Sequence, residues 1–126
     1  MKTIFVVDDN DVNLLSVKRA LENQYNVRAM PSAERMLTLL TKIVPDLILL
    51  DIDMPEMDGF EAIQKLKKSE KTSNIPVVFL TATIDDEVEA RGFELGAVDF
   101  VTKPFSPLDL LNRISHHLNI IAVNNK

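Results

Sequence analysis

Carboxylates follow two of the most apolar segments of the chain. Asp8 and Asp9 come directly after residues 4–7, and Asp51 comes directly after residues 47–50. Carboxylates gathered at one place repel one another unless a cation lies among them. Mg²⁺ takes oxygen ligands and keeps several of its waters, so a few carboxylates are enough to bind it. These residues therefore predict a Mg²⁺ site.

Three further polar residues could act together with these acids. Asp53 lies two residues beyond Asp51, Thr81 follows the third apolar run, and Lys103 follows a weaker one. A carboxylate beside Mg²⁺ and an ammonium stays ionised and can attack phosphorus. Phosphoryl transfer needs mainly positioning and neutralisation of the equatorial oxygens, a task that suits Mg²⁺, a hydroxyl and an ammonium. Each residue alone would be read as a turn, a cap or a surface charge, but the combination favours an aspartyl phosphate.

The elements that must position these residues alternate along the chain. Residues 4–7, 47–50 and 77–80 are uninterrupted apolar runs, which are typical of parallel strands covered on both faces. Residues 26–30 and 98–102 are weaker strand candidates. Helical patterns lie between the strands, and residues able to cap a helix precede them. These capping residues are Asn10 or Asp11, Ser32, Asp58 with Glu61, Asp85 with Asp86, and Ser106 with Pro107.

Five alternating strand and helix units predict an α/β domain of the (βα)₅ type. Such units form a parallel sheet with right-handed crossovers, here a three-layer sandwich. The most frequent arrangement is flavodoxin-like, with strand order 2-1-3-4-5. Ligands bind beyond the carboxyl ends of such strands, where the acids, Thr81 and Lys103 should converge. One domain is expected over residues 1–121, followed by a C-terminal tail at residues 122–126.

The composition fits one domain without nucleic-acid or membrane contacts. The 126 residues are 46 % hydrophobic and 26 % charged, with a formal net charge of −5. A negative charge argues against nucleic acid and anionic membranes as direct partners. The chain has no cysteine, its first apolar run is too short for a signal peptide, and no run approaches the ~20 residues of a membrane span. We expect a soluble, cytoplasmic protein.

Four motifs occur in a specific order and spacing. They are Val7-Asp8-Asp9-Asn10, the segment 50–59 (LDIDMPEMDG), Leu80-Thr81-Ala82, and the segment 96–105 (GAVDFVTKPF). Together they resemble the receiver domains of two-component response regulators, and the resemblance covers residues 2 to about 121.

The resemblance implies a role for each acidic residue. Asp51 matches the phosphoacceptor. Asp9 matches a direct Mg²⁺ ligand and Asp8 one that acts through water, while Asp51 and the backbone carbonyl of Asp53 complete the protein ligands. Asp53 departs from the pattern, because many family members have a neutral or basic side chain there. This departure leaves the lifetime of the phosphorylated form open.

The resemblance also implies a switch. Thr81 and Lys103 match the residues that contact the phosphoryl oxygens. Phe100 matches the aromatic switch residue, which turns inward when Thr81 moves. The Lys103–Pro104 bond matches the family's cis peptide.

The function implied is signalling rather than ordinary enzyme turnover. The phosphoryl group would come from a sensor histidine kinase or a phosphotransfer protein, and the domain would catalyse only its own phosphorylation and dephosphorylation. The output would be an effector domain or a target protein, and a homodimer that forms on phosphorylation is a further expectation. Because Met1 stands next to the first strand, we expect no upstream domain, whereas a downstream domain stays open.

Three other functions fit only part of this pattern. A haloacid-dehalogenase-type phosphatase would use Asp51 and Asp53, but its nucleophile usually follows the first strand and its acidic pair follows the lysine. A flavodoxin-like electron carrier would need a Ser-, Thr- and Gly-rich loop where Asp8 and Asp9 stand. A purely structural interaction domain would have no need of Asp51, the acidic pair and Lys103 together.

Overall fold

Five strands and five helices alternate through residues 1–124, the part of the chain that the computed structural model describes. The strands are β1 (Thr3–Val7), β2 (Asn26–Met30), β3 (Leu47–Asp51), β4 (Val77–Thr81) and β5 (Asp99–Thr102). The helices are α1 (Asp11–Leu21), α2 (Ala33–Leu39), α3 (Gly59–Lys68), α4 (Asp86–Leu95) and α5 (Pro107–Asn124). Helix α5 includes the first three residues of the predicted tail, and residues 125–126 lie outside the described part. The domain boundary at residue 121 stays a prediction.

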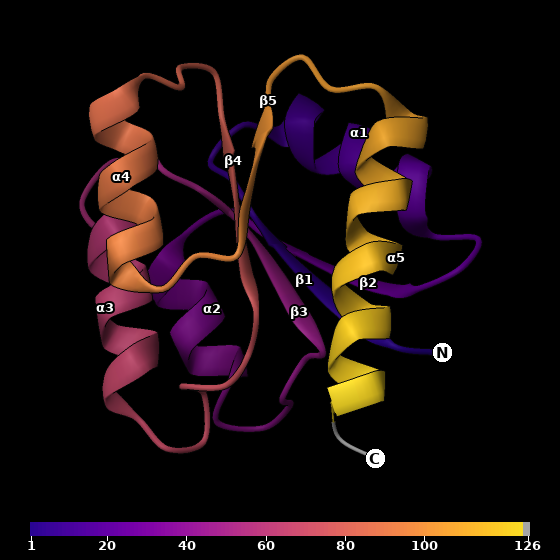
Figure 1. The fold of residues 1–126 in the computed structure, drawn as a ribbon, viewed down its shortest axis with the longest axis horizontal. Helices are drawn as coiled ribbons and strands as arrows, with labels where there is room; N and C mark the ends of the chain where they lie inside the picture. Colours follow the sequence, from indigo (N-terminus) through magenta and orange to yellow (C-terminus); the bar gives the residue numbers. More distant parts are fainter. Residues whose placement is uncertain (125–126) are drawn as a thin grey trace.

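The strands form one parallel sheet in the order β2-β1-β3-β4-β5. The predicted α/β class and strand order are thereby confirmed. Figure 1 shows the sheet between two helical layers, with α1 and α5 on one side and α2, α3 and α4 on the other. Every strand pair is parallel, so all five strands end at the same edge of the sheet.

Apolar side chains fill the space on both faces of the sheet. All residues of β3 and β4 are buried, as expected for uninterrupted apolar runs in the middle of a parallel sheet. One core lies beneath α2, α3 and α4, and the other lies beneath α1 and α5. Strand β2 is an edge strand with mostly exposed or half-buried residues, which explains its weaker apolar pattern.

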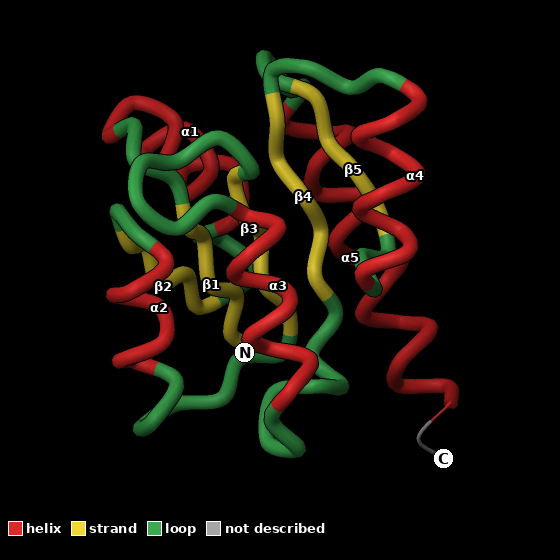
Figure 2. Tube along the Cα trace, turned by 90° about the vertical axis from the view of Figure 1, so that its left-hand side faces the viewer, coloured by secondary structure: helices red, strands yellow, loops and turns green. Residues whose placement is uncertain are grey.

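Side chains cap the helix starts where the sequence indicated. Asn10, rather than Asp11, caps α1 by accepting the amide of Asn13, and Asp58 caps α3 by accepting the amide of Glu61 at 2.9 Å. Gly96 ends α4 with φ of 112°, a left-handed conformation that glycine adopts without strain. These caps fix where each helix begins relative to the strand before it. Figure 2, which looks onto the side of α2, α3 and α4, shows the loops that follow the strands at one end of the molecule.

Within the described residues, no helix is both long and apolar enough to cross a membrane.

Candidate functional site

The parallel register sets the carboxylates side by side. Leu50 of β3 pairs with Val7 of β1, so the residues that follow them, Asp51 and Asp8, lie level at the edge of the sheet. Both strands are buried on either face, which holds this pairing in place because a slip would force the side chains of both cores to repack. The site therefore depends on backbone that cannot shift without disturbing the core.

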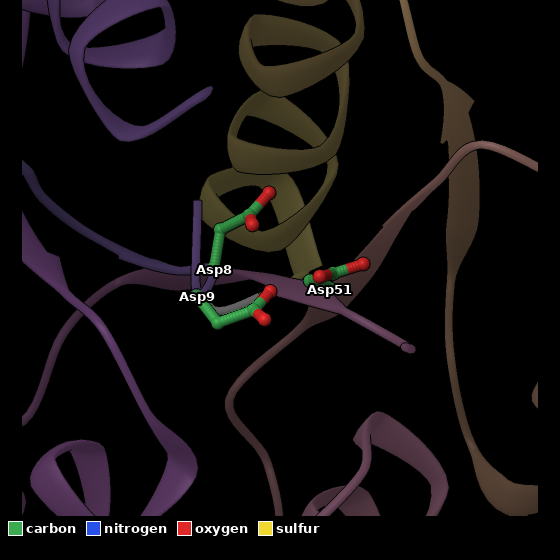
Figure 3. Close-up of side chains that lie close together, drawn as sticks. All are labelled: Asp8, Asp9 and Asp51. Atoms are coloured by element: carbon green, nitrogen blue, oxygen red, sulfur yellow. The ribbon is translucent and has the colours of Figure 1, made fainter. Parts of the chain in front are cut away.

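Three carboxylates meet at this edge. One carboxylate oxygen from each of Asp8, Asp9 and Asp51 lies within 4.8 Å of the other two. Asp8 is fully buried and Asp51 is 2 % exposed, whereas Asp9 is exposed. Figure 3 shows the three side chains beside one another, with Asp8 and Asp9 from adjacent positions and Asp51 from β3. Two acids of the group are thus shielded from solvent, and Asp9 is open to it.

One ammonium group serves two of these carboxylates. Lys103 Nζ lies 2.8 Å from Oδ2 of Asp8 and 3.2 Å from Oδ1 of Asp51. Backbone amides complete the contacts, because Asn10 donates to Oδ1 of Asp8 at 2.9 Å and Asp53 donates to Oδ1 of Asp51 at 3.3 Å. Among the described residues, no hydrogen-bond donor other than this ammonium contacts the buried Oδ2 of Asp8. The negative charge is thus only partly compensated.

The protonation of Asp51 reflects that imbalance. Burial and the negative charge of Asp8 raise the pKa of Asp51 from 3.8 to about 6, although Lys103 and the Asp53 amide act in the opposite direction. Burial alone would lower the pKa of Lys103, but its bonds to Asp8 and Asp51 outweigh burial and raise that pKa. The ammonium therefore stays charged, and Asp51 is a carboxylate whose ionised form lacks a further cation.

Thr81 lies at the same edge but does not contact Asp51. It is buried at the end of β4, and its hydroxyl donates to the Thr83 carbonyl oxygen at 3.2 Å. The Thr81 carbonyl accepts the Lys103 amide at 2.9 Å, which ties the end of β5 to β4. The Lys103–Pro104 peptide bond that follows is cis.

The remaining predicted residues lie around this centre. Asp53 is exposed, and its amide points to Asp51. The Phe100 ring is 7 % exposed and lies inward, with its centroid 5.5 Å from that of Phe79. Phe100 is therefore buried in the same structure in which the Thr81 hydroxyl bonds to Thr83.

The sequence reasoning missed the role of Gly59. A β-carbon at this position would lie 2.6 Å from the Asp51 carbonyl oxygen and 2.7 Å from the α-carbon of Ile52, closer than van der Waals contact allows. The Gly59 amide donates to the Ile52 carbonyl at 2.8 Å. This close approach packs the start of α3 against the end of β3 at Asp51 and Ile52. A glycine directly after the Asp58 cap was the available signal.

The residues present fit a hard divalent cation. All three acids offer oxygen ligands, two of them are buried, and Asp9 leaves an open approach from solvent. A cation there would relieve the repulsion that raises the pKa of Asp51. The Lys103 ammonium also contacts this carboxylate and Asp8, so a phosphoryl group that approaches Asp51 would meet both a bound cation and the ammonium.

Comparison with known proteins gives one consistent answer. The family model for "Response regulator receiver domain" matches residues 4–115. The chain is 44 % identical over 116 residues to a probable cyclic di-GMP phosphodiesterase of Vibrio cholerae, covering 92 % of this chain and 26 % of that protein. It is 39 % identical over 118 residues to the transcriptional regulatory protein YvrH of Bacillus subtilis, covering 92 % and 48 %.

A solved structure of the chemotaxis protein CheY4 of Vibrio cholerae superposes with a TM-score of 0.88 at 27 % identity, covering 92 % of this chain and 98 % of that one. The chain spans less than half the length of the two curated relatives named above. The dehalogenase-type alternative finds no support. It would place the nucleophile after the first strand, whereas here the acidic pair follows β1 and Asp51 is the last residue of β3. The chain therefore belongs to the receiver domains of two-component response regulators.

Proposed function

We propose that Asp51 accepts a phosphoryl group in a Mg²⁺-dependent reaction, with a sensor histidine kinase or a phosphotransfer protein as donor. The observation that carries this proposal is the buried carboxylate of Asp51, which lies beside the acidic pair and in contact with Lys103. It is 2 % exposed, its pKa is raised to about 6, and the Lys103 ammonium lies 3.2 Å away. Asp9 and Asp51 would hold the metal directly, Asp8 through water, and the Asp53 carbonyl would complete the protein ligands.

The reaction forms one bond and breaks one bond. An Asp51 oxygen bonds to phosphorus while the bond from phosphorus to the donor nitrogen or oxygen breaks, and the donor keeps that electron pair. A metal held by Asp9 and Asp51 would supply positive charge to the phosphoryl oxygens. The Lys103 ammonium, in contact with Asp51, supplies a further positive charge. Thr81 must exchange its bond to the Thr83 carbonyl for one to a phosphoryl oxygen, which makes it a mobile contact.

We further propose that the signal leaves through a change at Thr81 and Phe100. The output would be an effector domain or a target protein, and phosphorylation would favour a homodimer. In this proposal the domain turns over no external substrate, since it catalyses only its own phosphorylation and dephosphorylation. The cytoplasmic location stays a prediction.

The test uses a small phosphodonor. Incubation with acetyl phosphate and Mg²⁺ should add one phosphoryl mass, and Asp51→Asn should remove this labelling. The matched control is Asp99→Asn, which changes a partly buried carboxylate at the opposite end of the sheet and should leave labelling intact. Full labelling of Asp51→Asn, or steady turnover of a small phosphate ester by the wild type, would overturn the proposal.

A further inference from the structure

Four phenylalanine rings form a continuous chain from α3 to the outer surface of α4. Phe60 meets Phe79 edge-on with centroids 5.6 Å apart, and Phe79 lies 5.5 Å from Phe100. Phe100 lies 5.2 Å from Phe93, which is 46 % exposed. Phe60 directly follows Gly59, the residue packed against the Asp51 carbonyl. Packed side chains thus connect the end of β3, where Asp51 lies, with the exterior of the domain.

Gly92 occupies a special place beside this chain. It is buried on the inner side of α4, opposite the ring of Phe100. A β-carbon at position 92 would overlap Cζ of Phe100 and would lie 3.1 Å from its Cε1 and 3.2 Å from Cδ2 of Phe79. Carbon atoms in contact are normally about 3.5–4.0 Å apart. The inward ring of Phe100 therefore occupies the space that any other residue at position 92 would fill.

The backbone at position 92 does not itself require glycine. Gly92 lies inside α4, and Gly96 is the glycine with positive φ in the described residues. Glycine inside a helix makes unfolding about five-fold more favourable than alanine does, because it loses more backbone entropy on folding. Space for the Phe100 ring is what the missing side chain provides in return.

We propose that Gly92 is a positioning residue that forms the socket for the inward state of Phe100. With a β-carbon in the socket, the ring must turn outward about its own side-chain torsions, because its inward tip is then blocked. Phe79 is fully buried, so moving the Phe100 ring disturbs fewer packed neighbours than moving Phe79 would. The socket stands on packing alone, and its signalling consequence rests on the proposed function at Asp51.

The position of Thr81 bears on whether the space at position 92 acts independently of Thr81. The Phe100 ring is inward while the Thr81 hydroxyl donates to the Thr83 carbonyl at 3.2 Å. The inward ring is thus compatible with the bond between Thr81 and Thr83. Space at position 92 is a requirement of its own, and Gly92→Ala should remove that space without touching Asp51, Lys103 or Thr81.

A thermodynamic cycle tests the socket without phosphorylation. Gly92→Ala is measured in the wild type and in Phe100→Leu, whose side chain lacks the Cε and Cζ atoms that the new β-carbon would meet. The control is Ala90→Gly on the exposed side of the same helix, which reports the cost of glycine there. In Phe100→Leu, Gly92→Ala should lower the unfolding constant about five-fold, matching the reversed control.

In the wild type, the same substitution should give no stabilisation or should raise the unfolding constant. Failure of Gly92→Ala to fold, with recovery in the double variant, would support the socket equally. Equal stabilisation in both backgrounds would overturn it, because glycine would then matter only for helix propensity.

Nuclear magnetic resonance spectra with Mg²⁺ and beryllofluoride, a phosphoryl analogue, test the consequence. In Gly92→Ala the contacts between the Phe100 and Phe79 rings should be lost, while the amide of Asp53 should shift as in the wild type. Shifts at Phe93 and Val98 should shrink. Retained contacts between the rings would overturn the socket. Absence of an Asp53 shift in the wild type would instead count against the proposed function, and the thermodynamic cycle would still decide the socket.

Discussion

Two carboxylates at opposite ends of the sheet share the same chemistry but have different surroundings. Asp51 ends β3 and Asp99 begins β5, and each forms an ion pair. At Asp51, the Lys103 ammonium is shared with a second carboxylate, Asp8, to which it lies nearer. Asp51 is thus one of two buried acids that share one positive charge.

Several donors surround the single negative charge of Asp99. Arg113 contacts its two oxygens at 3.0 and 3.1 Å, His117 Nε2 lies 3.0 Å from Oδ2, and the Phe100 amide donates to Oδ1 at 2.8 Å. Burial alone would raise the pKa of Asp99, but these contacts lower it below its ordinary value. For Asp51, burial and Asp8 win, and the pKa rises to about 6.

The difference lies in how far the partners of each carboxylate compensate its charge. Both sites have an ion pair, so an ion pair alone does not distinguish them. What differs is whether the partners fully satisfy the ionised form. Asp99 joins β5 to α5 and needs nothing more, whereas Asp51 is held in a charged state that a further cation or an electrophile would stabilise.

Removal of the positive partner should give the largest contrast. Lys103→Met keeps the apolar stem but leaves Asp8 and Asp51 buried without a cation, so unfolding at pH 8 without divalent ions should become easier by about 3 kcal/mol or more. Arg113→Met, at a side chain that is 43 % exposed, should cost about 1 kcal/mol or less. Urea unfolding measures both. Equal costs would show that the two ion pairs are equivalent after all.

The pH dependence of stability should have opposite signs at the two sites. Between its ordinary pKa of 3.8 and its folded pKa of about 6, Asp51 binds a proton more strongly in the folded chain. Its contribution therefore declines as the pH rises through this window, by up to about 3 kcal/mol without divalent ions. Asp51→Asn should abolish this decline. Urea unfolding should therefore show a difference in stability between the wild type and Asp51→Asn that changes with pH.

Asp99 should act in the other direction and in another window. Because its folded pKa is lowered, its contribution is present above about pH 4 and is lost as the pH falls below that value. Asp99→Asn should therefore lower stability at pH 8 and matter less at pH 3.

For Asp51, a constant difference in stability between the wild type and Asp51→Asn from pH 4 to pH 8 would contradict the comparison.

The sequence predicted the meeting of Asp51 and Lys103 better than it predicted the Asp99 cluster. Asp51 and Lys103 each follow a strand, and the ends of neighbouring parallel strands meet, so spacing along the chain was enough to bring them together. Asp99, Arg113 and His117 are 14 and 18 residues apart on a strand and a helix. Their contact depends on how α5 packs on the sheet, which no local pattern encodes.

The side-chain orientations at the edge were also beyond the sequence. Thr81 was placed correctly at the end of its strand, but its hydroxyl bonds to Thr83 because a backbone carbonyl lies within reach. The close approach of Gly59 to the Asp51 carbonyl follows from the path of the loop. Packing in three dimensions decides such contacts, whereas the apolar runs decide only which residues reach the edge.

Mg²⁺ should stabilise the wild type by a smaller amount, and this effect should distinguish the two carboxylates most directly. A ligand that binds only the folded chain raises its stability by about 1.4 kcal/mol when it is present at ten times its dissociation constant. At pH 8 the stabilisation should appear in the wild type and in Asp99→Asn, because Asp99 begins β5 and is not among the three clustered acids. It should be much reduced in Asp9→Ala, which removes the exposed ligand while leaving the buried ion pairs of Lys103 in place. Thermal unfolding with Mg²⁺, and again after removal of Mg²⁺ by a chelator, measures the effect. An equal shift in Asp9→Ala and the wild type would mean that the cation binds elsewhere, and the unsatisfied charge of Asp51 would then need another explanation.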